Sequence, residues 1–164
     1  MSPQYVYILI TFILFSFSCR ATPYVLNNDV ILVDKKNNIK VLVNISIPTD
    51  KETINCDYWG TGVINKECII QNKISNIIIE IGNKEVFMAA SAYLDLVNIK
   101  IIKLKDVKEN SFIIYIRGGD AAASYTAYIL IENFRLKWRR VESGEFSTEW
   151  WEETIYSWVP DDGR

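Results

Sequence analysis

The chain has 164 residues, of which 49% are hydrophobic and 23% are charged, and its formal net charge is −2 with no histidine. This length and balance predict a single globular domain and exclude a disordered chain. The small net charge gives no reason to expect nucleic acid or an anionic membrane surface as a partner. Without histidine, the chain lacks the Ser-His-Asp and Cys-His mechanisms and the zinc sites that need imidazole.

The first segment of the chain is expected to be a targeting sequence. Residues 5–15 are apolar but too short for a comfortable membrane span, and small and polar residues follow, as in a secretory signal peptide. No Lys or Arg precedes this apolar core, so only the terminal amine supplies the usual positive end. Three interpretations are open: a signal peptide 1–21 cleaved after Ala21, acylation of Cys19 as the first residue of a bacterial lipoprotein, or an uncleaved anchor. We expect residues 22–164 to form one exported domain, in the periplasm, at the outer membrane or outside the cell.

Two strands are predicted after this segment. Residues 30–33 are a short apolar run, and the cluster at 34–38 is rich in residues that form turns. From Ile39 to Ile47, apolar side chains then occupy every second position, which is the clearest strand pattern in the chain. This period of two predicts a strand with one buried face.

The connection at 48–62 is long and polar, and a loop of this length is usually functional or tied down. It carries Cys56. With Cys19 set aside, Cys56 and Cys68 form an even pair, which in an exported domain predicts one disulfide. The bond would close a loop of ~13 residues and stabilise the domain by about 3 kcal/mol in the chain-entropy model. Two buried free thiols are the alternative, and the spacing does not suit a metal site.

The middle of the chain is expected to add strands separated by short turns. Residues 62–70 and 76–81 are strand-like, and a hairpin turn leads into a further strand at 85–88. Residues 89–97 have helical spacing, which we interpret as a single helical turn between strands. Residues 99–104 form a strand again, with a bulge where the alternation slips at its third and fourth residues.

Residues 112–116 are apolar on both faces, which suits a central strand that is covered on both sides. Gly118 and Gly119 end this run, and small residues follow. Glycine permits positive φ, and three alanines permit close backbone approach. The structural interpretation is a bulge and a tightly packed corner, and the functional one is a ligand-contacting loop. The candidate contacts of such a loop are Asp120, Ser124 and Tyr125.

A basic strand is predicted next. Residues 125–131 are β-branched and aromatic, and residues 132–135 suit a hairpin connection. Beyond it, apolar and basic residues alternate, which predicts one buried face with Trp138 in the core and one charged face. The basic candidates on that charged face are Arg135, Lys137 and Arg139.

The C-terminal segment is acidic and rich in aromatic residues. From Glu142 to Asp162 there are seven acids and no base, so we expect this segment to lie near the basic strand and to compensate part of its charge. Residues 149–158 are predicted to pack against 136–140, since a loose tail has no reason to carry three tryptophans. Aromatic side chains beside charges are typical of protein-binding surfaces, and a tryptophan-rich surface also suits stacking on sugar rings. The aromatic candidates are Trp150, Trp151, Tyr156 and Trp158.

Taken together, these elements predict an all-β domain, either an antiparallel sandwich or a partly closed barrel. We expect roughly eight to ten short strands, with at most one or two short helical turns. Long amphipathic helices are not predicted, which argues against parallel βαβ folds.

We expect a small, exported, non-catalytic protein of the bacterial envelope that binds another protein, in the manner of an inhibitor or an immunity protein. No cofactor and no metal are expected, because no nucleotide-binding, phosphate-binding or metal motif is present. One alternative is a carboxylate-based glycan-active enzyme or a glycan-binding module, although acids gathered in one segment imitate a glycosidase pair only weakly. The other is a structural envelope lipoprotein, which would meet the membrane only through the leader or an acyl chain on Cys19.

Overall fold

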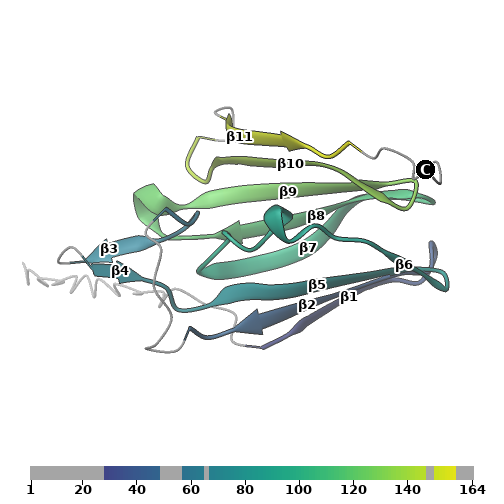
Figure 1. Cartoon of the computed structure of the whole chain (residues 1–164), viewed down its shortest axis with the longest axis horizontal. Helices are drawn as coiled ribbons and strands as arrows, with labels where there is room; N and C mark the ends of the chain where they lie inside the picture. The colour runs from purple at the N-terminus through teal and green to yellow at the C-terminus, as the bar shows by residue number, and fades with distance from the viewer. Residues whose placement is uncertain (1–27, 49–56, 65–66, 147–149, 158–164) are drawn as a thin grey trace, which may run out of the picture.

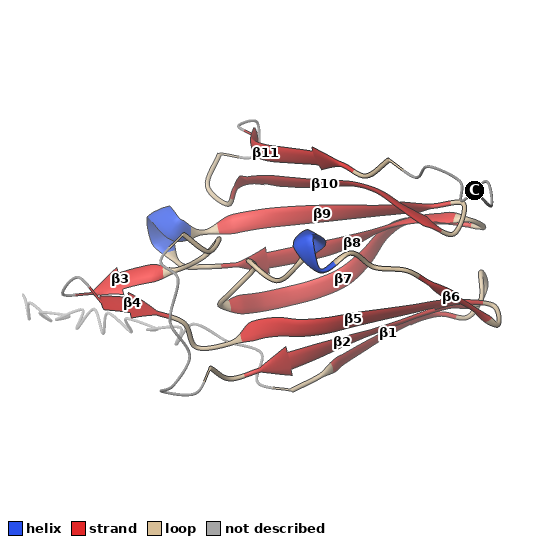
Figure 2. Ribbon diagram, viewed as in Figure 1, coloured by secondary structure: helices blue, strands red, loops and turns tan. Residues whose placement is uncertain are grey.

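A computed structural model describes residues 28–48, 57–64, 67–146 and 150–157, and most of these lie in β-strands. The strands form two antiparallel sheets that face each other, with a small hairpin beyond one end (Figures 1 and 2). The predicted all-β fold is confirmed, and it takes the form of a sandwich, because the two sheets remain separate.

The strand order fixes which segments are neighbours. The four-stranded sheet has the order β1 (Val30–Asp34), β2 (Ile39–Ser46), β5 (Lys73–Ile81) and β6 (Lys84–Val86). The five-stranded sheet has the order β11 (Trp150–Ile155), β10 (Arg135–Ser143), β9 (Tyr125–Glu132), β8 (Ser111–Gly118) and β7 (Ile99–Lys108). The separate hairpin pairs β3 (Gly62–Ile64) with β4 (Glu67–Ile69). Within the described residues, the helical turns are two 3-10 segments, η1 (Ala90–Ala92) and η2 (Ala121–Ala123).

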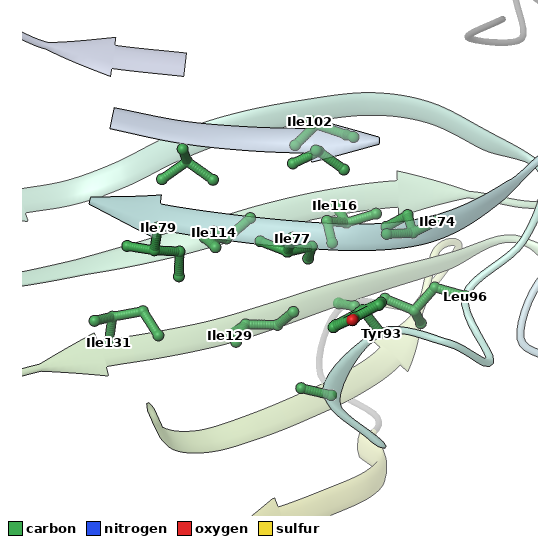
Figure 3. Packing of buried hydrophobic residues seen from close by; sticks show 14 of the residues in the cluster. Ile74, Ile77, Ile79, Tyr93, Leu96, Ile102, Ile114, Ile116, Ile129 and Ile131 are labelled. Carbon is green, nitrogen blue, oxygen red and sulfur yellow. The ribbon is translucent and has the colours of Figure 1, made fainter. Parts of the chain in front are cut away.

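The core lies between the two sheets and consists mainly of β-branched side chains. Ile77 and Ile79 of β5 face Ile114 of β8 and Ile129 of β9 across the sandwich (Figure 3). The sequence pattern already placed Ile77 and Ile79 on one face, because successive side chains of a strand point to opposite faces. Burying each such side chain stabilises the folded state by roughly 1.5–3 kcal/mol relative to leaving it exposed.

The outer face of the five-stranded sheet is not covered by another element among the described residues. Phe112, Ile114 and Ile116 of β8 are buried, whereas Ile113 and Tyr115 between them are only half-buried. The prediction of a strand covered on both sides is therefore wrong. The apolar residues on the outer side of β8 belong to a surface instead of a second core.

A bulge in β10 reverses which residues face inward. The ladder to β9 pairs Leu136 with Ile131 and Trp138 with Leu130, so Lys137 is an extra residue. Beyond it Arg139 faces the core side and is 2% exposed, while Trp138 is half-buried on the outer face. The prediction of Trp138 in the core and Arg139 on a charged face is therefore wrong, because one inserted residue shifts the alternation by one step.

Smaller differences concern strand ends. The stretch predicted as one strand at 62–70 is the hairpin of β3 and β4. The ladder between β7 and β8 has two irregularities. One is a bulge at Lys100, because Ile99 and Ile101 pair with adjacent residues of β8, and the other lies between Lys105 and Lys108. The hairpin between β9 and β10 is confirmed, and Asn133 and Phe134 both have positive φ, as a tight two-residue turn requires. The part of the chain that the structure describes contains no helix long and apolar enough to span a membrane.

Candidate functional site

A cleft of about 630 Å³ opens beside the start of β11. The start of β11 lies toward the end of the sandwich from which the β3–β4 hairpin projects (Figure 1). The walls of the cleft come from the loop before β3, from η2 and from the start of β11. Trp150 is 54% exposed and Trp151 is 41% exposed, although tryptophan is highly buried on average. We call this site the tryptophan cleft, and it is lined by Tyr58, Trp59, Gly60, Thr61, Ala122, Ala123, Trp150 and Trp151.

Two indole rings form one wall of the tryptophan cleft. The ring centroids of Trp59 and Trp151 are 5.4 Å apart and the ring planes differ by 14°. The backbone holds Trp59 in place, since its N–H donates to the Asp95 carbonyl oxygen (2.8 Å) and its own carbonyl accepts from the Val97 N–H (3.0 Å). The indole N–H of Trp59 also donates to Glu152 Oε2 (3.1 Å).

Behind this wall lies an ion-pair network centred on the buried Arg139. Its Nη1 and Nη2 donate to the two carboxylate oxygens of Asp95, at 2.8 and 2.7 Å, in the bidentate geometry that is strongest for arginine. Nη1 also donates to the Ser91 carbonyl oxygen (2.7 Å), and Nη2 lies 3.5 Å from Glu152 Oε2. Because Glu152 in turn accepts from Trp59, the network connects β10, β11 and the loop that carries the wall.

Beside this wall, Gly60 belongs to a tightly packed corner. Gly60 has a φ of +92°, and a Cβ atom there would lie 2.6 Å from the Val97 carbonyl oxygen. Gly119 also has positive φ, and a Cβ atom there would collide with the carbonyl group of Ala123. Only glycine avoids both the backbone strain and the overlap at these positions. The structural interpretation of the Gly-Gly and alanine run thus fits the observed corner.

The loop candidates of this run lie in different places. Tyr125 is fully buried, its hydroxyl donates to the Val97 carbonyl oxygen (3.1 Å), and burial raises the pKa of Tyr125 well above its ordinary value. Asp120 and Ser124 line a separate hollow of about 350 Å³. There, a hydrogen bond from Lys100 (2.9 Å) together with its charge lowers the pKa of Asp120.

The other candidates divide between the cleft and the rest of the domain. Arg135 is exposed at the start of β10, and Lys137 is the bulged residue. Tyr156 is half-buried and its N–H donates to the Lys137 carbonyl oxygen (2.9 Å), so it secures the end of β11. Trp158, Cys56 and Cys19 lie outside the described residues, so the disulfide with Cys68 of β4 and the lipidation both stay predictions.

Two carboxylates of the C-terminal segment are already engaged. Glu152 points toward Arg139 and Trp59, whereas Glu153 pairs with Arg140 on the other side of β11 (3.0 Å). No Asp or Glu is among the described residues that line the tryptophan cleft. Nor do the described residues contain a group of three or more metal-ligating side chains.

The comparisons with protein-family models, curated proteins and solved structures gave no match. The periodic pattern in the sequence missed Tyr58 and Trp59, which lie in the long polar connection. Two large aromatic residues within a polar loop are themselves a signal, because such a loop gains nothing from them unless they meet another surface.

Proposed function

We propose that this protein is a small, exported, non-catalytic protein of the bacterial envelope that binds another protein through the tryptophan cleft. The observation that carries the proposal is the exposure of Trp150 and Trp151 beside an open cleft. Tryptophan is enriched among the few residues that supply most of the binding energy in protein interfaces. Large apolar side chains gathered at one exposed place are typical of interaction sites.

The rigidity of the site supports an inhibitor-like or immunity-like role. Trp59 is held by two backbone hydrogen bonds and by Glu152, and Glu152 is positioned beside the buried Arg139. A preorganised wall loses little conformational entropy when a partner binds. Inhibitor complexes are generally of this preorganised kind, with small backbone changes on association.

The test compares capture of partners from the native host by three forms of the protein. The wild type and the control Phe87→Ala, which removes an exposed aromatic ring elsewhere, are expected to retain one common partner. The double variant Trp150→Ala/Trp151→Ala is expected to lose it. With the purified partner, loss of a hot-spot tryptophan should raise the dissociation constant by roughly 30-fold or more. Equal affinity of the double variant and the control contradicts the proposal.

A glycan-binding module is the second candidate, and one specific observation favours it. The nearly parallel rings of Trp59 and Trp151 offer a flat apolar wall, and the cleft volume of about 630 Å³ lies in the usual range for small-ligand sites. Titration of tryptophan fluorescence with envelope oligosaccharides distinguishes the two candidates. A saturable change that Trp151→Ala abolishes, without a protein partner, would favour the glycan module.

A further inference from the structure

The outer face of the five-stranded sheet carries lysines held over tyrosine rings. Lys105 Nζ lies 3.8 Å from the centroid of the Tyr115 ring, and Lys103 Nζ lies 4.8 Å from the same centroid. Tyr128 of the next strand meets Tyr115 edge to face, with centroids 5.5 Å apart. We call this region the lysine–tyrosine face, and we define it by Lys103, Lys105, Ile113, Tyr115, Arg117, Tyr128 and Leu130.

The cations of this face have no carboxylate partner in the part of the chain that the structure describes. Other bases of the described residues do form ion pairs, such as Lys100 with Asp120 and, on the four-stranded sheet, Lys40 with Glu80. Several acids lie at the border of the lysine–tyrosine face. Asp106 follows Lys105 in β7, and Asp120, which pairs with Lys100, lines the same hollow as Arg117 and Glu145. Glu142 accepts the Tyr128 hydroxyl (2.7 Å), Glu153 pairs with Arg140, and Glu132 stands at the end of β9. The centre of the face, at Lys103 and Lys105, is therefore positive, although the whole chain has a formal net charge of −2.

The same face is partly apolar. Ile113 and Leu130 are half-buried and lie on the outer sides of β8 and β9. Lys105 contacts both tyrosine rings, since its Nζ also lies 5.5 Å from the Tyr128 centroid. Cation–π contacts of this kind reduce the freedom of a long side chain before any partner arrives. The face thus combines fixed positive charge with apolar surface.

We infer that the lysine–tyrosine face is a second docking surface, separate from the tryptophan cleft, and that it binds an acidic segment of a partner protein. The carboxylates of that segment would meet Lys103, Lys105 and Arg117, and its apolar side chains would cover Ile113 and Leu130. Charge complementarity carries the choice of occupant. Nucleic acids and other dense polyanions are usually bound by more than three cations and by chains with a net positive charge, whereas this face offers three cations on a chain without net positive charge.

The experiment measures the binding of a labelled synthetic peptide by fluorescence anisotropy, with the full chain after the leader. In the peptide, glutamate alternates with leucine, and the controls are a glutamine–leucine peptide, polyglutamate and a single-stranded oligonucleotide. The test variant is Lys103→Glu/Lys105→Glu. Its matched control is Lys35→Glu/Lys36→Glu, which makes the same change of charge in an exposed turn. If the test variant does not fold, Lys103→Gln/Lys105→Gln replaces it.

The wild type is expected to bind the glutamate–leucine peptide, more weakly at high salt, and to bind the glutamine–leucine peptide much less. The test variant should bind about tenfold more weakly, whereas the Lys35/Lys36 control and Trp150→Ala/Trp151→Ala should bind as the wild type does. Three results would overturn the inference. They are no binding by the wild type up to about 1 mM, an equal loss in the control variant, or equally tight binding of polyglutamate or the oligonucleotide. Because the cleft variant is measured in parallel, failure here is distinguishable from failure of the proposed function.

Discussion

Arg139 is the side chain on which the tryptophan cleft most depends. It is 2% exposed and its guanidinium connects Asp95, Ser91 and Glu152. A buried charge is tolerated only while its partners compensate it, and removal of one partner leaves the full desolvation cost. The Nε atom of Arg139 has no hydrogen-bond partner among the described residues, so the two carboxylates carry most of the compensation.

Asp95→Ala should therefore destabilise the fold by about 3–5 kcal/mol, because it removes the bidentate acceptor of a buried arginine. Urea unfolding followed by circular dichroism measures this. The matched control is Glu153→Ala, which breaks the more exposed pair with Arg140 and should cost about 0–1 kcal/mol. A similar loss of unfolding free energy in both variants would show that the Arg139 network stabilises the fold no more than the pair of Glu153 with Arg140 does.

Two tyrosines give the stability a dependence on alkaline pH. Burial, followed by the hydrogen bond to Glu142, raises the pKa of Tyr128 above its ordinary value of 10.0, and burial raises the pKa of Tyr125 still more clearly. A pKa that is higher in the folded state favours the neutral hydroxyl there. The resulting stabilisation is complete below pH 10 and is lost as the pH rises through the folded value.

We therefore expect the thermal midpoint to fall above about pH 10, and to fall less steeply in Tyr128→Phe than in the wild type. The comparison between the two proteins matters because lysines also lose their protons in this range. Parallel curves for the wild type and Tyr128→Phe would contradict the assigned role of Tyr128.

At the scale of elements, the corner between β8 and β9 sets the shape of the cleft. Gly119 follows β8 with a φ of +67°, and η2 begins two residues later, after Asp120. The N–H of Gly119 donates to the Asn98 carbonyl oxygen (3.0 Å), which ties the corner to the start of β7. The alanines of η2 can line the cleft because this turn brings the chain back toward the loop before β3.

Gly119→Ala should lower the free energy of unfolding by about 2 kcal/mol or more, because the residue would be strained and would collide with Ala123. Gly62→Ala is the matched control, since a Cβ atom there meets nothing within 4 Å. Differential scanning calorimetry on both variants checks the difference. Equal midpoints would show that the corner adapts without cost.

At the scale of the whole molecule, the two sheets present different outer faces. On the four-stranded sheet Lys40 pairs with Glu80 at 3.4 Å, and the exposed Ile31 and Val33 lie on the edge strand β1. On the five-stranded sheet, Arg140 lies 4.5 Å from the Trp138 ring and 4.0 Å from the Trp150 ring, between the lysine–tyrosine face and the cleft. We therefore expect partner proteins to bind on the side of the five-stranded sheet.

Export is the prediction that belongs to the whole chain. The mature protein should lack the residues up to about Ala21, or should begin at an acylated Cys19, because the apolar core there is too short to span a membrane. Intact mass spectrometry of the native protein decides this. The same spectrum, before and after reduction and alkylation, tests the bond between Cys56 and Cys68. A full-length chain in the cytoplasm, with two free thiols, would refute both predictions.

The local sequence determined most of the strands, the helical turn near Ala90 and the hairpin at Asn133, because alternation and turn chemistry act between close neighbours. It also determined that Ile77, Ile79 and Ile81 of β5 share one buried face, but not which apolar residues of β8 point inward. It did not determine the inward position of Arg139. The regular alternation of apolar and basic residues continues through Lys137, so the sequence does not show the bulge there.

Only the tertiary structure decided where the candidate site lies. Trp59 and Glu152 are 93 positions apart and still share a hydrogen bond, and Arg139 meets Asp95 across 44 positions. Periodicity describes one strand at a time, whereas these contacts depend on the order of strands and on loops that return to distant edges. The physical reason is that a buried charge and a stacked ring are stable only where distant segments supply their partners.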